Sequence, residues 1–234
     1  MSTIMIIAAH PDDEVLGCGG TIAKHATQGD QVHILILAEG LTSRDKNRDI
    51  STRKEELGQL AQTAKTAGKL LGAHGVMLLG LPDNRLDTVP RLDLIKKIEA
   101  VISKIQPSIV YTHHGGDLNI DHRITCEAVI TACRPYPGQA VRTLLFMEIP
   151  SSTGWQVPDT HITFNPTWFT DISARDKGTS FLEKKLNALR VYDSEMRAFP
   201  HARSIEAVKA LARWRGASAG LNAAEAFVSG RQIH

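Results

Sequence analysis

The chain is poor in cysteine, has no long apolar run and carries almost no excess charge of either sign. Three cysteines in 234 residues are too few for a disulfide scaffold and suggest a reducing compartment. Cys126 and Cys133 fall in one expected helix, where they would lie about 10 Å apart, too far to bridge. The sequence therefore predicts a fold that is held together by an ordinary apolar core.

Long hydrophobic segments and a signal peptide are also missing. No apolar run reaches the roughly 18 residues that a membrane span needs. The first residues, Met1 to Ile4, have neither a basic region nor a small-residue cleavage site. A formal net charge of +2 argues against a nucleic-acid-binding protein, which normally carries a basic stripe. We therefore expect a cytoplasmic protein with no membrane partner and no nucleic-acid partner.

Short apolar runs alternate with segments of helical periodicity through the first 135 residues, which is typical of an α/β fold with a mostly parallel sheet flanked by helices. Strands are expected at 4–9, 31–38, 76–79 and 108–112. Helices are expected at 15–28, from a Thr52–Glu55 capping box to about 71, at 92–105 and at 121–133.

The pattern changes after Pro135, where strands at 144–149 and 168–172 and helices at 181–190 and 204–215 are expected. The length and an ordinary composition, with 42% hydrophobic and 22% charged residues, suit one large domain. We predict a single domain over residues 1–234. Its core spans about 1–135, and residues 136–234 complete the sheet and the site.

Two polar clusters follow the first and fourth predicted strands. The first is His10-Pro11-Asp12-Asp13-Glu14, and the second runs from His113 to His122. Parallel sheets bind ligands beyond the carboxyl ends of their strands, and a doubly wound sheet can bring two such ends together. Imidazole and carboxylate are good zinc ligands. We therefore expect a zinc site made of His10, Asp13 and a histidine of the second cluster, with Asp12 left free as a base.

The first cluster also allows a plainer interpretation. It could be a turn followed by helix caps, because aspartate is a good N-cap. Histidine and carboxylate ligands also bind ferrous iron, so ferrous iron is an alternative to zinc. Gly17, Gly19 and Gly20 do not form a dinucleotide-binding loop, because the position that needs the last glycine holds Ile22. Close packing of a helix on the sheet accounts for them better.

The segment Ala9-His10-Pro11-Asp12-Asp13-Glu14, followed by Gly17-x-Gly19-Gly20, resembles the signature of the LmbE-like, or PIG-L-like, zinc-dependent N-deacetylase family. That family's second motif, of the His-Pro-Asp-His type, corresponds to Asn119-Ile120-Asp121-His122. The strong similarity covers roughly residues 4–130. It continues more weakly through Tyr192-Asp193-Ser194-Glu195 and Ala224-Glu225-Ala226-Phe227.

The resemblance implies a Rossmann-like fold and removal of an acetyl group from an N-acetylglucosamine-type group. By the same resemblance His10, Asp13 and His122 bind zinc, Asp12 is the general base, and Asp121 orients a neighbouring group. Arg53, in an Arg-x-x-Glu segment, is a candidate substrate contact. A homo-oligomer is also implied.

Asn119 is a departure from the family pattern, which usually has histidine at this position. Asparagine can donate a hydrogen bond to an oxyanion but cannot transfer a proton at neutral pH. We therefore expect Asp12 to act as both base and acid, and His113 or His114 is the alternative proton donor. His113 is also a candidate substrate contact.

Several further residues are candidates from their type and position alone. Arg85, in the loop after the third strand, is a candidate substrate contact. Arg44, Arg48, Arg85 and Arg203 could form a basic rim for a phosphate or a nucleotide on the substrate. Trp155, Trp168 and Trp214 are expected to be core or interface anchors, and His201 is expected to be a loop residue without a special role.

The sequence thus predicts a zinc-dependent hydrolase that removes an N-acetyl group from an amino sugar or an amino-sugar conjugate, with a nucleotide-linked sugar as one candidate. One alternative is a zinc amidase that cleaves a larger N-acyl group or a thiol–sugar conjugate. The other is a non-catalytic sugar- or nucleotide-binding protein of the same fold, against which the intact His10, Asp12, Asp13 and His122 argue.

Overall fold

A computed structural model describes residues 1–157 and 162–233. Its strands are β1 (Thr3–Ala8), β2 (Gln31–Ala38), β3 (Gly75–Leu81), β4 (Ile109–His113), β5 (Thr143–Met147), β6 (Trp168–Asp171), β7 (Arg175–Asp176), β8 (Thr179–Ser180) and β9 (Ala224–Gln232). Its α-helices are α1 (Asp13–Thr27), α2 (Lys54–Leu71), α3 (Arg91–Ile105), α4 (Ile120–Ala132), α5 (Phe181–Val191) and α6 (Ile205–Ala217). Two short 3-10 helices lie at Thr42–Arg44 and Leu86–Thr88.

The central sheet has the strand order β3-β2-β1-β4-β5-β9-β6. The five strands from β3 to β5 are parallel, and β9 is antiparallel to both of its neighbours. The order reverses between β1 and β4, which is where an open α/β sheet leaves a crevice for ligands. The α/β class and the mostly parallel sheet that the sequence predicts are therefore confirmed.

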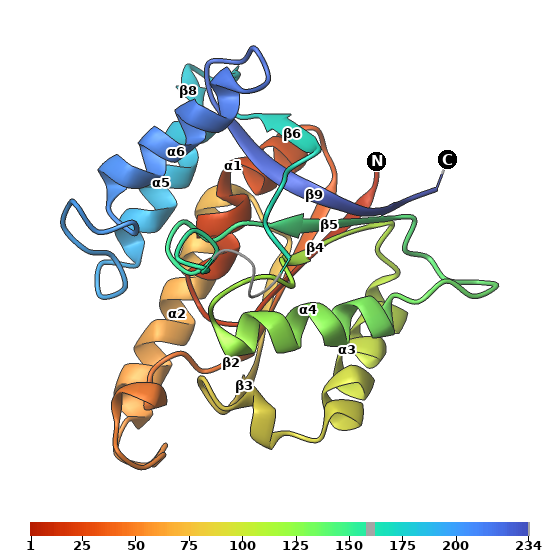
Figure 1. Cartoon of the computed structure of the whole chain (residues 1–234), viewed down its shortest axis with the longest axis vertical. Helices are drawn as coiled ribbons and strands as arrows, with labels where there is room; N and C mark the ends of the chain where they lie inside the picture. Colours follow the sequence, from red (N-terminus) through yellow and green to blue (C-terminus); the bar gives the residue numbers. More distant parts are fainter. Residues whose placement is uncertain (158–161, 234) are drawn as a thin grey trace.

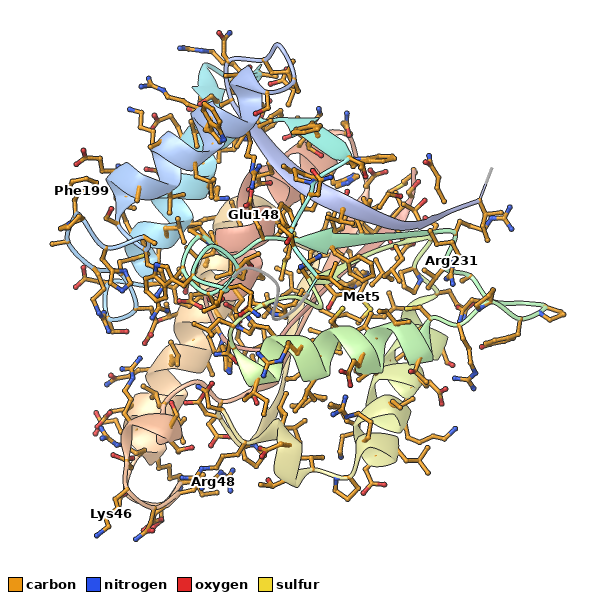
Figure 2. All side chains as sticks on the ribbon, viewed as in Figure 1. Met5, Lys46, Arg48, Glu148, Phe199 and Arg231 are labelled. Carbon is orange, nitrogen blue, oxygen red and sulfur yellow. The ribbon has the colours of Figure 1, made fainter. Side chains whose placement is uncertain are left out.

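Helices cover both faces of the sheet (Figure 1), and the strands are buried between them. Alternate residues of β1 show this directly, because successive strand side chains point to opposite faces. Ile4 and Ile6 belong to the apolar core under α1, α2 and α5. Met5 and Ile7 belong to the core under α3 and α4, and Met5 lies in the middle of the molecule in Figure 2.

Gly17 and Gly20 confirm the predicted close packing of the first helix. A Cβ atom on Gly17 would lie 2.5 Å from the sulfur atom of Met147, and one on Gly20 would lie 2.6 Å from Cγ2 of Ile172. Any larger residue would therefore push α1 away from the elements that it covers.

Two features of local structure differ from the sequence-based expectation. Thr52 does not cap the second helix: α2 begins at Lys54 with no side-chain cap, and the Thr52 hydroxyl instead donates to the Asp49 carbonyl oxygen. Strand β9 is not predicted by the sequence pattern, because Ala224-Glu225-Ala226 lacks a clear strand signal. It forms because its backbone pairs with β5 on one side and with β6 on the other.

Across the described residues, no helix combines the length and the apolar character that crossing a membrane requires.

Candidate active site

The two polar clusters of the sequence meet at the switch point of the sheet. Strands β1 and β4 are parallel neighbours, with Ile7 opposite Thr112. His10 and Asp13 therefore follow β1 directly beside the end of β4, and the loop after β4 leads to His122 in the first turn of α4. Two segments separated by about a hundred residues are thus brought together by the strand order alone.

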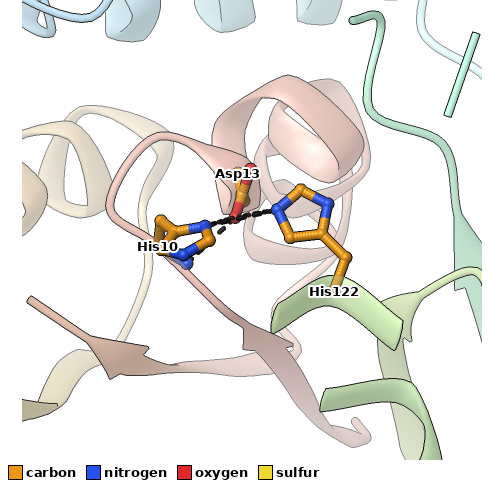
Figure 3. Close-up of side chains that lie close together, drawn as sticks. All are labelled: His10, Asp13 and His122. Atoms are coloured by element: carbon orange, nitrogen blue, oxygen red, sulfur yellow. Dashed lines mark hydrogen bonds and ion pairs between the residues drawn. The ribbon is translucent and has the colours of Figure 1, made fainter. Parts of the chain in front are cut away.

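Three side-chain atoms converge at this point (Figure 3), namely Nδ1 of His10, Oδ2 of Asp13 and Nε2 of His122. The two histidine nitrogens are 3.3 Å apart, and Oδ2 of Asp13 lies 3.2 Å from that of His10 and 3.1 Å from that of His122. Ligands bound tetrahedrally to zinc at 2.0–2.1 Å are about 3.3 Å apart. The spacing therefore fits three of four zinc ligands, with the fourth position left to water or substrate.

Each histidine of this trio has a carboxylate on its other ring nitrogen. Nε2 of His10 lies 3.1 Å from Oδ2 of Asp121, and Nδ1 of His122 lies 3.1 Å from Oδ1 of Asp117. A carboxylate in this place holds the proton on the outer nitrogen, so that the inner nitrogen offers a lone pair. Both imidazoles are thus oriented with the inner nitrogen toward the point where the three side chains converge.

Electrostatics also favours a cation between these groups. Asp13, Asp83, Asp117 and Asp121 are all buried around the two rings, and buried carboxylates require positive charge nearby. Burial lowers the pKa of His122, but Asp13 and Asp117 outweigh that effect and raise the pKa to about 9. Burial raises the pKa of Asp13, but His122 and His113 outweigh it and hold that pKa well below its ordinary value. The donor set therefore fits a divalent metal ion.

A second cluster of possible ligands, His10, Asp83 and Asp121, shares His10 with the first. It uses Nε2, the ring nitrogen that Asp121 already contacts. Because Asp121 is fully buried and also accepts a hydrogen bond from the Leu86 backbone N–H, it serves better to orient His10 than to bind a metal. The first trio is the better candidate.

Asp12 lies next to the trio without belonging to it. Its backbone φ of 107° is rare for any residue but glycine and costs of order 1–3 kcal/mol. The surrounding structure must therefore hold the backbone in this conformation. Oδ2 of Asp12 accepts a hydrogen bond of 3.0 Å from Arg203. Burial and the neighbouring charge of Asp13 raise the pKa of Asp12 well above its ordinary value, and Arg203 opposes that shift. A carboxylate in this state is suited to taking up a proton and returning it.

These groups open into a cavity of about 360 Å³, which is within the range of small-molecule sites. The residues that line it are His10, Pro11, Asp12, Asp13, Gly40, Ser43, Arg44, Asp83, Asn84, Leu118, Asn119, His122, Ile149, Ser151, Ser152, Trp155, Glu195 and Arg203. The cavity is thus lined by the converging trio, by Asp12 and by Asn119, and it reaches the loops after β2, β3, β4 and β5.

Asn119 is the N-cap of α4, and its Oδ1 accepts the backbone N–H of Asp121 at 2.8 Å. Its amide nitrogen donates one hydrogen bond of 2.9 Å to Asn84. The amide has a second N–H, and Asn119 lines the cavity. An oxyanion contact from Asn119 is therefore sterically open and stays a prediction.

The structure places His113 out of reach of a substrate. His113 is fully buried, its ring stacks on that of His122 at 3.9 Å, and its Nε2 accepts the backbone N–H of Ala9. Burial and the adjacent His122 lower its pKa to about 3. His114 is also buried, and its Nδ1 accepts the Gly116 N–H. Neither ring lines the cavity formed by the described residues, so neither suits the role of a proton donor to the leaving amine.

The predicted basic contacts also lie elsewhere. Arg53 pairs with Asp45 and Glu56, and neither Arg53 nor Arg85 is among the described residues that line the cavity. Two of the four arginines expected at the rim, Arg44 and Arg203, line the cavity, but these two and Arg48 are already held by carboxylates. Arg44 donates to both carboxylate oxygens of Glu195, Arg48 pairs with Glu39, and Arg203 pairs with Asp12.

Several residues that shape the site have no role that the sequence alone would assign. Asp117 orients His122 and accepts hydroxyl hydrogen bonds from Ser152 and Thr153. Arg203 contacts Asp12 from a loop that is about 190 residues distant in the chain. The density of histidine and aspartate around position 117 is a signal that could have identified Asp117, whereas nothing in the sequence pairs Arg203 with Asp12.

Comparison with known proteins adds an independent test. The PIG-L family, described as GlcNAc-PI de-N-acetylase, matches residues 5–133. The uncharacterized deacetylase YaiS of Escherichia coli (strain K12) is 30% identical over 196 residues, which are 82% of this chain and 90% of YaiS. The diacetylchitobiose deacetylase of Thermococcus kodakarensis is 29% identical and is matched over 82% of this chain and 69% of its own length.

A solved structure agrees in fold. The N,N'-diacetylchitobiose deacetylase of Pyrococcus horikoshii superposes with a TM-score of 0.77 and 20% identity, over 98% of this chain and 84% of the other. The family description and both relatives are named for deacetylation, and the solved structure agrees in fold. The chain belongs to the PIG-L family of deacetylases, and it is a hydrolase.

Proposed function

We propose that this protein is a zinc-dependent N-deacetylase that removes the acetyl group of an N-acetylated amino sugar or of its conjugate. The observation that carries the proposal is the trio of His10, Asp13 and His122, whose ligand atoms converge beside the carboxylate of Asp12. Two relatives are named for deacetylation of diacetylchitobiose, a substrate of the amino-sugar class.

His10, Asp13 and His122 would hold the metal, and Asp121 and Asp117 would fix the two imidazoles. Zinc at this position supplies Lewis acidity, which makes water available as a nucleophile near neutral pH and polarises the amide carbonyl. The same donor set accepts ferrous iron.

The residues of the chain carry the proton transfers. Asp12 takes the proton of the attacking water, with its carboxylate held in place by Arg203. The free amide N–H of Asn119 donates to the oxygen that gains negative charge. Asp12 then returns the proton to the departing amine, because neither His113 nor His114 lines the cavity. One carboxylate thus serves as base and then as acid.

The test is amine release from a panel of N-acetylated amino sugars, with metal-free, zinc-loaded and iron-loaded protein. We expect release that requires the metal. Asp12→Asn should lower kcat by about 10²–10⁴-fold while the protein still binds one equivalent of zinc. Wild-type turnover in Asp12→Asn would rule out the role of Asp12. Turnover that survives complete metal removal would rule out the metal-dependent mechanism.

A further inference from the structure

Trp155 is an exposed aromatic side chain at a polar cavity. Its exposure is 52%, and it lines the cavity together with Leu118, which is 47% exposed. A half-exposed tryptophan leaves a large apolar surface in contact with water, which is unfavourable. An aromatic side chain at a small-molecule site usually provides a flat contact for the ligand. The sugar class of the proposed function has such a surface, because the C–H groups on one face of a pyranose ring form an apolar patch.

The position of Trp155 relative to the metal trio is fixed from two sides. The segment Ile149–Trp155 folds on itself, and its Thr153 hydroxyl donates a 2.6 Å hydrogen bond to Asp117, the carboxylate that orients His122. On the other side, His201 meets the indole edge-to-face at 5.3 Å, and its Nδ1 accepts the backbone N–H of Arg203, which contacts Asp12. The position of the indole is therefore linked through Thr153 and Asp117 to His122, and through His201 and Arg203 to Asp12.

The charges that line the cavity leave no free cation for an anionic substrate among the described residues. Four carboxylates line it, those of Asp12, Asp13, Asp83 and Glu195, against two guanidinium groups. Both guanidinium groups already pair with carboxylates: Arg44 with Glu195, and Arg203 with Asp12. A divalent metal ion would bring the sum of these charges to zero. A phosphate or carboxylate on the substrate would then find no unpaired cation among the described residues that line the cavity.

We propose that this cavity takes an uncharged N-acetylated oligosaccharide, with the ring next to the reacting sugar stacked on Trp155, and that it discriminates against conjugates carrying a phosphate or a carboxylate. The proposal rests on the proposed function and specifies its substrate. Trp155 is the specificity-determining residue for the second ring, and the Arg44–Glu195 pair accounts for the exclusion of anions.

The first experiment compares three substrates on the zinc-loaded protein, namely N-acetylglucosamine, N,N'-diacetylchitobiose and UDP-N-acetylglucosamine. We expect kcat/KM to be at least about tenfold higher for the disaccharide than for either of the others, which corresponds to about one good contact. Equal or better turnover of the nucleotide-linked sugar would overturn the exclusion of anions. If no amine is released from these three substrates or from any larger N-acetylated sugar, the proposed function is overturned, and this proposal with it.

The second experiment changes Trp155. In Trp155→Ala the preference for the disaccharide over the monosaccharide should fall from about tenfold to about one, mainly through KM, whereas Trp155→Phe should keep most of it. Trp214→Ala is the matched control, because Trp214 is 67% exposed on α6 and does not line the cavity of described residues. A preference that survives Trp155→Ala in folded protein would overturn the stacking role.

The third experiment frees a cation. Glu195→Gln removes the charge that neutralises Arg44. We expect the ratio of kcat/KM for the nucleotide-linked sugar to that for the neutral disaccharide to rise about tenfold, with a stronger dependence on salt. An unchanged ratio in the folded variant would show that the Arg44–Glu195 pair does not set the preference for neutral substrates.

Discussion

Asp117 and Asp121 are the residues that orient the two histidines of the candidate metal site. Neither carboxylate belongs to the converging trio, yet each contacts the outer nitrogen of one imidazole. Asp117 does more than orient His122, because it also accepts the hydroxyl groups of Ser152 and Thr153. The geometry of the ligands thus depends on residues that would not touch the metal.

Asp117→Asn should weaken zinc binding by about 10–100-fold, because the outer nitrogen of His122 loses its carboxylate acceptor. A chromophoric chelator that competes for zinc measures the affinity. Asp30→Asn is the matched control, since Asp30 contacts Nδ1 of His25 at 2.8 Å but does not line the cavity. Wild-type affinity in Asp117→Asn, with the urea midpoint showing folded protein, would contradict the orienting role.

Helix α1 shows at the scale of an element why small residues follow the first motif. The helix begins at Asp13, one of the three converging residues, so that the close approach of α1 to neighbouring elements positions this candidate ligand. Gly17 contacts Met147, at the end of β5, and Gly20 contacts Ile172. Gly20 and Thr21 also donate their backbone N–H groups to Glu225, whose charge is balanced by the buried Lys185.

Gly20→Ala should destabilise the protein by about 1–3 kcal/mol, because its Cβ atom would overlap Ile172 in a packed interface. Gly58→Ala should instead stabilise it by about 0.5–1 kcal/mol, since Gly58 lies in the exposed face of α2 with no atom near the added methyl group. Urea unfolding of both variants measures the two effects. Stabilisation by both alanines would show that α1 has room to move.

The molecule as a whole buries its three thiols on both sides of the sheet. Cys18 belongs to the core under α1, α2 and α5, and Cys133 belongs to the core under α3 and α4. Burial raises the pKa of both Cys126 and Cys133 to about 12. All three cysteines are buried free thiols, so the two layers of the molecule are held by packing.

Thiol reactivity should therefore report global unfolding. At pH 8 only about one in 10⁴ of the Cys126 and Cys133 thiols would be ionised, and the thiolate is the reactive form. We expect less than one thiol to react with Ellman's reagent over minutes in native protein, and all three to react in denaturant. Rapid reaction of one thiol under native conditions would instead indicate local opening of one layer.

Prediction from the sequence succeeded where the controlling interactions are local. The apolar runs of β1, β2 and β4 and the periodicity of α3 and α4 gave the order of the elements, and the short spacing between His10 and Asp13 gave two ligand candidates. Prediction failed for β9 because its strand conformation comes from hydrogen bonds to β5 and β6. It also failed for the arginines, because the pairing of Arg44 with Glu195 joins positions 151 residues apart.

The sequence by itself determined the fold class and the chemical types of the candidate ligands, since apolar periodicity and donor chemistry are properties of short segments. Only the tertiary structure decided which groups meet. The strand order places His122 beside His10, burial removes His113 from the cavity, and loop contacts bring Arg203 to Asp12 and Trp155 to the rim. These are long-range consequences of packing, and no short segment of the chain contains them.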